Sequence, residues 1–348
     1  MAISPRAAFG ASIAVLASAL LLAACGSSSS TDATTAADAG GSITVYSGRE
    51  AEYMEPVFEA YEKKTGTDLQ VRYGDSADLA LLISEEGERS PADVFLAQSP
   101  ISQSYLDQKS LLSPLPTAVL DRVPENLRAA DGDWVGIAGR QRVLIYNTDL
   151  LKESDLPKSV LELTNAKYRD KVAVAPSNAS FQDFVAALDQ LEGTETTNEW
   201  LKGMAANGAK AYAKNSAIAE AVARGEIPMG LVNHYYVLEI KEDDPSAPVA
   251  AYRFPGTDPG SLFLVATASV PTASPDKQQA DDLVGFLVSD EGQKLIIGGE
   301  GEYPTATGVN PPEGAPSLTK GDYPAYDLTG NTDLKAVAEQ IRESGLAQ

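Results

Sequence analysis

Cysteine and histidine are almost absent from this 348-residue chain, which has one of each. A single cysteine, Cys25, excludes an intramolecular disulfide and a cysteine metal cluster. The single histidine, His234, and the lack of HExxH and GxSxG motifs disfavour a metallohydrolase and Ser-His-Asp chemistry. These absences make a binding protein the main class to consider and leave an enzyme as a weaker alternative.

Basic residues are also scarce: 27 lysines and arginines stand against 49 aspartates and glutamates, for a formal net charge of −22. A chain this acidic repels phosphate backbones, so we expect no nucleic-acid partner. An anionic surface is compatible with collecting a cation, but many exported proteins are acidic only for solubility.

A long apolar run occurs only at the start of the chain. Residues 10–24 are too short for a comfortable permanent membrane span and have the pattern of a signal peptide. The run ends in LAACG (22–26), the lipobox at which bacterial lipoproteins are cleaved and lipidated on the cysteine. We therefore predict a signal peptide over 1–24, a lipid anchor at Cys25 and a flexible, Ser/Thr/Ala/Gly-rich tether over 25–41.

Strand-like and helix-like segments alternate along the rest of the chain. Short apolar runs predict strands, and apolar residues at i, i+3, i+4 and i+7 predict helices between them. This alternation indicates an α/β fold with mainly parallel sheets covered by helices. The predicted strands are 43–46, 69–73, 93–96, 143–146, 171–175, 229–232 and 262–266, and the predicted helices include 54–61, 78–86, 181–191, 200–207 and one that starts at Ser274-Pro275.

Roughly 300 residues after the tether are enough for two lobes with separate cores. Two α/β lobes joined by a few crossing strands suit a cleft that closes on its ligand by a hinge motion. We predict a first lobe from 42–140 and 265–310, and a second lobe from 141–264 and 311–348. At this level an α/β enzyme remains an alternative.

The sharpest local feature is Tyr235-Tyr236, which follows a predicted strand. Neighbouring residues of a regular strand point to opposite faces, so both phenols reach one point only if the chain bends there, as at a strand-to-helix junction. Phenols titrate at about pH 10, so only a strongly acidic cation such as ferric iron would hold both as phenolates. A core tyrosine beside a surface tyrosine at a turn is the plainer alternative.

A series of blocks covers nearly all of the chain from Ile43 onward in one order. The blocks are ITVYSGRE (43–50), EEGERSPADVFLAQS (85–99), DWVGIAGRQRVLIYNT (133–148), PSNASF (176–181), YAKNSAIAEAVARGEI (212–227), LVNHYY (231–236), DPGSL (258–262), DEGQKLI (290–296) and EYP (302–304). In these blocks the chain resembles the ferric-ion-binding proteins of bacterial ABC iron importers. The resemblance implies a two-lobed periplasmic-binding-protein-like fold without enzymatic activity, which binds Fe³⁺ and delivers it to an ABC permease and its ATPase.

The resemblance also implies an iron-binding set. In that family two adjacent tyrosines donate phenolates to the ion, and the matching residues are Tyr235 and Tyr236. Glu50 stands where the family has a histidine or another donor, and Gln98 where it commonly has a carboxylate. Carboxylate is a harder donor than imidazole, so Glu50 is a plausible replacement, whereas the neutral amide of Gln98 is a poor partner for a trivalent ion. Phe181 disfavours the subtype with a third tyrosine at that position.

Charge counting leaves room for an anion. Fe³⁺ with two phenolates and Glu50 is neutral but has coordination positions unfilled, which water or an anion such as phosphate or carbonate would occupy. Arg140 matches a family arginine near that anion and would neutralise it in bidentate fashion; a structural ion pair beside the hinge is the alternative. The resemblance carries the remaining anion contacts over to Ser99, Asn178, Ala179, Ser180, Asn215 and Asn233.

Other readings stay open. His234 lies beside the tyrosines, but the family does not use that position as a ligand, so we expect it to pack or hydrogen bond locally. The same fold binding an organic or anionic solute, such as a polyamine, thiamine or phosphonate, is the alternative function; Glu50 and Gln98 favour it, and the preserved tyrosines oppose it. We expect a monomer outside the cytoplasm, anchored to the lipid bilayer through Cys25.

Overall fold

The computed structural model describes residues 41–319, 321–326 and 334–347. The predicted signal peptide (1–24), Cys25 and the predicted tether up to residue 40 lie outside these residues. The described residues belong to one compact unit. None of the helices in them has the length and apolar character that a membrane span requires.

The described strands join in the order β2-β1-β3-β10-β5-β8-β6-β7, with β4 paired to β10 and β9 paired to β5. Parallel pairs link β1 to β2 and β3, and β6 to β7 and β8, whereas every pair that involves β5 or β10 is antiparallel. The strands are β1 Ser42–Ser47, β2 Asp68–Tyr73, β3 Val94–Ala97, β4 Leu112–Ser113, β5 Trp134–Asn147, β6 Val172–Val174, β7 Lys210–Ala211, β8 Met229–Asn233, β9 Val249–Tyr252 and β10 Phe263–Pro271.

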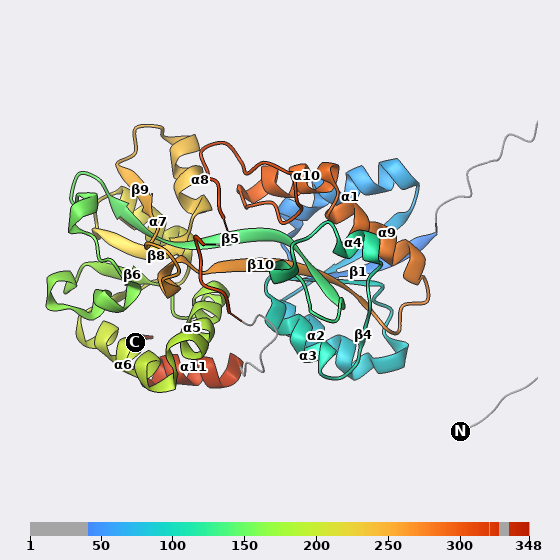
Figure 1. The fold of residues 1–348 in the computed structure, drawn as a ribbon, viewed down its shortest axis with the longest axis horizontal. Helices are drawn as coiled ribbons and strands as arrows, with labels where there is room; N and C mark the ends of the chain where they lie inside the picture. The colour runs from blue at the N-terminus through green and yellow to red at the C-terminus, as the bar shows by residue number, and fades with distance from the viewer. Residues whose placement is uncertain (1–40, 320, 327–333, 348) are drawn as a thin grey trace, which may run out of the picture. The chain divides into compact units, whose positions relative to one another are not determined.

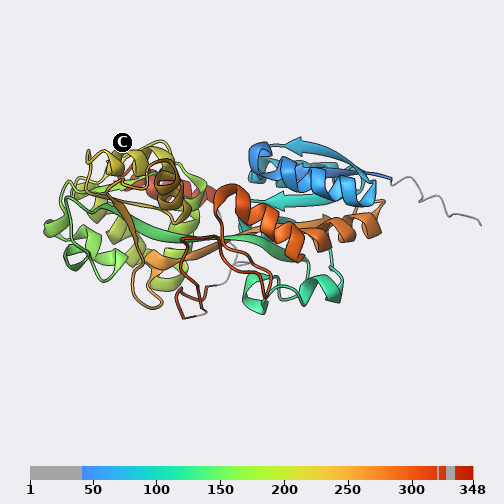
Figure 2. The same cartoon turned by 90° about the horizontal axis from the view of Figure 1, so that it is seen from above.

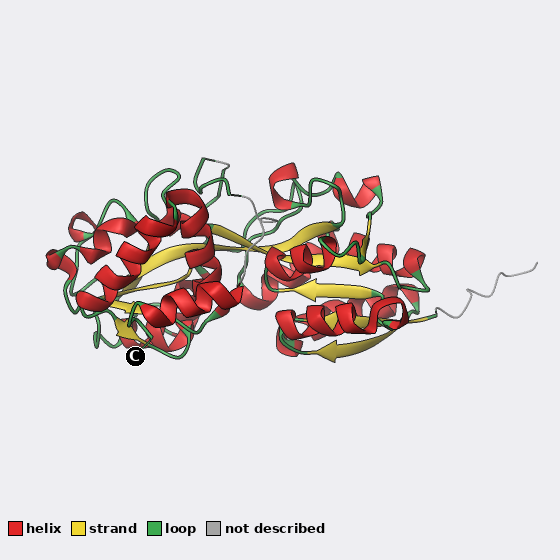
Figure 3. Cartoon of the chain, turned by 90° about the horizontal axis from the view of Figure 1, so that it is seen from below, coloured by secondary structure: helices red, strands yellow, loops and turns green. Residues whose placement is uncertain are grey.

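Helices cover the strands in each part of the sheet (Figure 3). The first long helix, α1, packs against β2 and α10 (Figure 2). It ends at Gly66, whose φ of 77° lies in the left-handed region that glycine adopts easily. The helices are α1 Ala51–Thr65, α2 Ser76–Glu86, α3 Pro100–Asp107, α4 Thr117–Leu120, α5 Ala179–Glu192, α6 Thr194–Ala206, α7 Asn215–Ala223, α8 Tyr235–Asp243, α9 Lys277–Leu287, α10 Asp290–Glu300 and α11 Leu334–Glu343.

Strands β5 and β10 run side by side between two groups of elements (Figure 1). The first part of β5 pairs with β10, and its last part, Arg142–Asn147, pairs with β8 and β9. Every residue of β5 is buried. The predicted strand at 143–146 is therefore only the end of a 14-residue strand that connects the two groups.

Apolar side chains form separate cores in these groups. In what we call the first lobe, β1, β3, α1 and α9 contribute Val45, Val94, Phe58 and Leu283. In the second lobe, β6, α5, α6 and α11 contribute Val174, Phe184, Trp200 and Ile341. Complete burial of each such side chain contributes about 1.5–3 kcal/mol, so each lobe has a core of its own. The lobe boundaries that we predicted residue by residue stay a prediction.

The start of α9 differs from the prediction. The helix begins at Lys277, not at the residue after Ser274, and the Ser274 hydroxyl does not cap it. That hydroxyl donates to Asp93 Oδ1 at 2.6 Å, because the carboxylate of Asp93 is buried and needs a partner. Leu283, Phe286 and Leu287 form the buried apolar face of this helix.

Candidate functional site

Tyr235 and Tyr236 lie at a strand-to-helix junction, as the sequence predicts. Strand β8 ends at Asn233, α8 begins at Tyr235, and His234 between them already has helical φ and ψ of −58° and −37°. Because the chain bends here, the two tyrosine rings lie side by side, with centroids 4.6 Å apart and planes tilted by 45°. The bend thus removes the opposite-face arrangement that a continued strand would impose.

A buried arginine lies next to both phenols. Asn233 Nδ2 donates to the Tyr235 hydroxyl at 3.0 Å, and Asn233 Oδ1 accepts from Arg142 Nη1 at 3.0 Å. Burial lowers the pKa of Arg142 to about 10, against the opposing effect of Tyr235 and Tyr236, so this guanidinium is charged at neutral pH. A cation beside a phenol favours the phenolate form, which is the form that binds a metal ion. Sequence analysis missed Arg142 because it gave the arginine role to Arg140.

The residues predicted for anion binding gather around the same guanidinium. Asn178 Oδ1, at the N-cap of α5, accepts from the Ser180 hydroxyl at 2.6 Å and from Asn215 Nδ2 at 3.2 Å. Arg142 Nη1 lies 3.4 Å from Ser180 Oγ. Asn178, Ser180, Asn215 and Asn233 therefore form one network with Arg142, while Ala179, the first residue of α5, is exposed.

Arg140 points to a different partner. Its Nη2 donates to the carbonyl oxygen of Gln98 at 2.5 Å and lies 3.8 Å from Asp183 Oδ2. Asp183, on α5, is 6% exposed; burial raises its pKa to about 6, while Arg140, a hydrogen bond from Ser99 and Arg142 oppose that rise. Arg140 thus has the ion pair that we considered as an alternative, and Asp183 joins the group of predicted residues.

Four buried polar atoms in this region have no hydrogen-bond partner among the described residues: Arg140 Nη1, Arg142 Nη2, Asp183 Oδ2 and Asn215 Oδ1. Buried polar groups in proteins are nearly always paired, so this concentration is unusual. Two are cationic donors and two are oxygen acceptors. The arrangement suits a ligand that brings both an anion and a cation. We call these four residues with Asn233, Tyr235 and Tyr236 the tyrosine site.

The two remaining predicted iron ligands lie on the first lobe. Glu50, the N-cap residue of α1, is exposed, and among the described residues its side chain makes no hydrogen bond or ion pair. Gln98, directly after β3, is half-buried; its backbone N–H donates to Ser76 Oγ at 3.0 Å and its carbonyl accepts from Arg140. Gln98 and Ser99 are therefore connected to the tyrosine site through Arg140 and Asp183, whereas Glu50 is not.

His234 hydrogen bonds and packs locally, as predicted. Its Nδ1 accepts from the Gln141 N–H at 3.3 Å, its Nε2 lies 3.1 Å from the Gly301 carbonyl, and its ring stacks on Tyr303 with centroids 4.3 Å apart. Burial lowers the pKa of His234 to about 4, so the ring is neutral and Nε2–H is the donor to Gly301. Both ring nitrogens are used within the protein.

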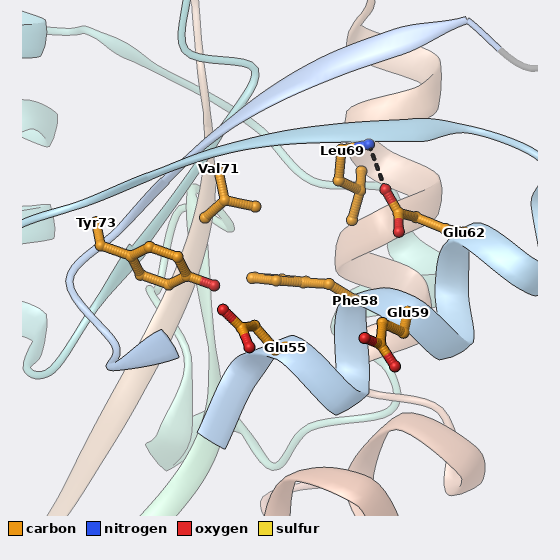
Figure 4. Close-up of a pocket in the computed structure, with 7 residues that line it drawn as sticks. All are labelled: Glu55, Phe58, Glu59, Glu62, Leu69, Val71 and Tyr73. Carbon is orange, nitrogen blue, oxygen red and sulfur yellow. Dashed lines mark hydrogen bonds between the residues drawn. The ribbon is translucent and has the colours of Figure 1, made fainter. Parts of the chain in front are cut away.

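A separate pocket of about 210 Å³ lies between α1 and β2 (Figure 4). Glu55 and Glu59 line it beside Phe58 and Tyr73, and Glu62 is held by the backbone N–H of Leu69 at 2.7 Å. None of the predicted site residues lines this pocket, so it is distinct from the tyrosine site.

Three carboxylates outside the site also lie together. Oxygens of Asp107, Asp131 and Asp133 are all within 4.8 Å of one another. Burial and the neighbouring charges of Asp131 and Asp107 raise the pKa of Asp133 to about 6. This cluster belongs to the first lobe, at the end of α3 and the start of β5, and contains none of the predicted ligands.

Comparison with known proteins decides the family. Residues 47–294 match the family model of the bacterial extracellular solute-binding proteins. The chain belongs to that family. This solute-binding protein is 33% identical over 311 residues to the major ferric iron-binding protein of Neisseria meningitidis, a match that covers 87% of this chain and 93% of the relative.

Solved structures agree on the fold. The iron-bound HitA structure from Pseudomonas aeruginosa is 32% identical and superposes with a TM-score of 0.81, covering 87% of this chain and 99% of that one. The Trichodesmium IdiA (FutA) structure in complex with iron and citrate is 26% identical, with a TM-score of 0.77 over 88% of this chain and 99% of that one. The predicted fold class, a two-lobed α/β binding-protein fold, is confirmed.

Proposed function

We propose that this solute-binding protein captures ferric iron outside the cytoplasm and delivers it to the permease of an ABC importer. The observation that carries the proposal is the side-by-side pair of Tyr235 and Tyr236 next to the buried guanidinium of Arg142. Two phenols in this setting suit a hard, trivalent cation and have no comparable use for a small organic solute. The similar Neisseria and Pseudomonas proteins are named for, or contain, iron.

The proposed iron ligands are the phenolates of Tyr235 and Tyr236 on the second lobe, together with Glu50 and Gln98 from the first lobe. Lobe closure by a hinge motion around β5 and β10 would bring the two sets together. Protonation of a phenolate or carboxylate ligand weakens its bond to the ion, so iron binding weakens as the pH falls.

An anion is the proposed co-ligand. The unpaired Nη2 of Arg142 and the network of Asn178, Ser180, Asn215 and Asn233 offer donors to phosphate or carbonate. The Trichodesmium structure, which contains citrate as well as iron, supports a site of this kind. Arg140 and Ser99 are proposed anion contacts on the side of Asp183, and Ala179 offers its backbone N–H at the start of α5.

The N-terminal features complete the proposal. Cleavage before Cys25 and lipidation of this cysteine would hold the protein, as a monomer, on the outer face of the cell membrane. There it would meet the permease, which a cytoplasmic ATPase powers. The protein acts as a binder and not as an enzyme. Mass spectrometry of membrane-extracted protein tests the lipid anchor, and a lipidated N-terminal Cys25 is the expected result.

The central test is optical. Ferric salt added to the full-length protein in detergent, with phosphate or carbonate present, is expected to give a red-to-purple phenolate charge-transfer band. Tyr235→Phe/Tyr236→Phe should abolish the band, because phenylalanine has no donor oxygen. Tyr73→Phe is the matched control, since Tyr73 is 38% exposed on β2 and lies outside the site. A colourless wild-type protein that binds a polyamine, thiamine or phosphonate instead would establish the alternative function.

A further inference from the structure

Position 98 is neutral in the expected iron-binding set. The resemblance to ferric-ion-binding proteins implies a carboxylate at this position, and this chain has Gln98. A neutral amide contributes less than a carboxylate to the binding of a trivalent ion. Glu50 is exposed and has no contact that connects it with the tyrosine site. A buried carboxylate near position 98 would provide the charged ligand that Gln98 does not.

Asp183 is a buried carboxylate close to position 98. It accepts a hydrogen bond from Ser99, the residue after Gln98, and its Oδ2 is 3.8 Å from the Arg140 nitrogen that also binds the Gln98 carbonyl. On its other side it interacts with Arg142, the guanidinium that also interacts with Tyr235 and Tyr236. Asp183 therefore interacts both with the residue after position 98 and with the guanidinium that interacts with the two phenols.

The state of the Asp183 carboxylate also favours a bound cation. The residue is 6% exposed, and Oδ2 has no hydrogen-bond partner among the described residues. The Arg140 contact at 3.8 Å is an ion pair without a hydrogen bond at this oxygen, since it exceeds normal hydrogen-bond length. A buried carboxylate oxygen left in this state is costly unless something else binds it.

We infer that Asp183 supplies the carboxylate that position 98 lacks, so that this ligand comes from α5 of the second lobe and joins Glu50 from the first lobe. The inference rests on the proposed function. It implies that the second lobe holds the two phenolates and this carboxylate. It also implies that an added anion binds beside Arg142, because Asp183 already faces Arg140.

The competing role for Asp183 is purely structural: its charge would only neutralise Arg140. The two roles predict opposite rescues. If Asp183 binds the iron, Gln98→Glu will restore a carboxylate ligand and with it the iron affinity that Asp183→Asn loses. If Asp183 only neutralises Arg140, Arg140→Gln will restore the iron affinity of Asp183→Asn, because it removes the unpaired cation.

The experiment is a titration of the full-length protein with ferric salt against a competing chelator, read from the charge-transfer band. Asp183→Asn is expected to weaken iron binding about tenfold or more and to shift the band, because a ligand group has been lost. Adding Gln98→Glu should return the affinity to within about threefold of wild type, whereas adding Arg140→Gln should not. Thermal melting without iron shows whether each variant is folded.

Three results would overturn the inference while leaving the proposed function intact, because wild type would still show the band. These are a normal affinity in Asp183→Asn, a rescue by Arg140→Gln in place of Gln98→Glu, and a gain of about tenfold or more when Gln98→Glu is introduced alone. The last variant keeps Asp183, so it decides the matter even if Asp183→Asn fails to fold. A wild-type protein without the band would overturn the proposed function itself.

Discussion

His234 follows β8 and precedes Tyr235, so its neighbours alone make it a tempting iron ligand. The ring instead satisfies the Gln141 N–H and the Gly301 carbonyl and stacks on Tyr303. We expect His234→Ala to lower the free energy of unfolding by about 2–3 kcal/mol, because two buried backbone groups and a ring contact lose their partner. Denaturant unfolding of the iron-free protein measures this. The folded variant should keep the charge-transfer band at the wild-type wavelength, and loss of the band would make His234 a ligand.

At the residue scale, the tyrosine pair was predictable and its electrostatic environment was not. A strand followed by Tyr235-Tyr236 indicates a bend from its own pattern, and the bend is present. Asp183 stands on a predicted helix between Phe181 and Phe184, where an acid ordinarily indicates a solvated face. Its burial depends on Ser99 and Arg140, which are far away in sequence. Long-range pairing of this kind leaves no local signal, so Asp183 and Arg142 needed the structure.

At the element scale, a buried ion pair connects the segment between β1 and α1 with the segment after α10. Arg49 Nη1 and Nη2 donate to the two carboxylate oxygens of Glu302 at 3.0 and 2.7 Å, and both side chains are 1% exposed. The next residue, Tyr303, pairs with Gly139 of β5. Burial raises the pKa of Glu302, but the charge and hydrogen bonds of Arg49 outweigh burial and the net shift is downward. The pair therefore stabilises the fold at neutral pH and loses this effect as acid protonates Glu302.

Glu302→Gln should lower the free energy of unfolding at neutral pH by about 3–5 kcal/mol, since it leaves the buried Arg49 charge unpaired. Glu291→Gln is the matched control: its partner Lys64 is 55% exposed, and exposed pairs contribute about 1 kcal/mol or less. The difference between the two variants should shrink as the pH falls below the normal range of a glutamate. Equal effects at neutral pH would show that the buried pair has no special role.

The boundaries of helices and strands are harder to predict from the sequence than their presence. The strand and helix patterns of β1, α1, β2 and β8 follow from apolar spacing within a few residues. The start of α9 does not, because Ser274 is drawn to the buried Asp93 instead of capping the helix. The length of β5 was also missed, since Gly136, Gly139 and the polar residues between 140 and 142 interrupt the apolar run although all are buried.

For the whole molecule, the proposed site links ligand binding to lobe closure. Arg140 and Arg142 stand on the crossing strand β5, the tyrosines on the second lobe and Gln98 on the first. An ion that binds only the folded, closed state raises the free energy of unfolding by about 2.7 kcal/mol at a free concentration of one hundred times its Kd. For a domain of this size we expect the melting temperature to rise by about 4 °C.

Calorimetry of the full-length protein with and without ferric ion measures this rise, and a chelator should reverse it. Tyr235→Phe/Tyr236→Phe should melt at nearly the wild-type temperature without iron and show no rise with it. An equal rise in the double variant would mean that iron stabilises the protein at another place. The carboxylates of Asp107, Asp131 and Asp133 are the acidic group to examine then, and Asp133→Asn would distinguish the two sites, because it weakens that cluster and leaves the tyrosine site unchanged.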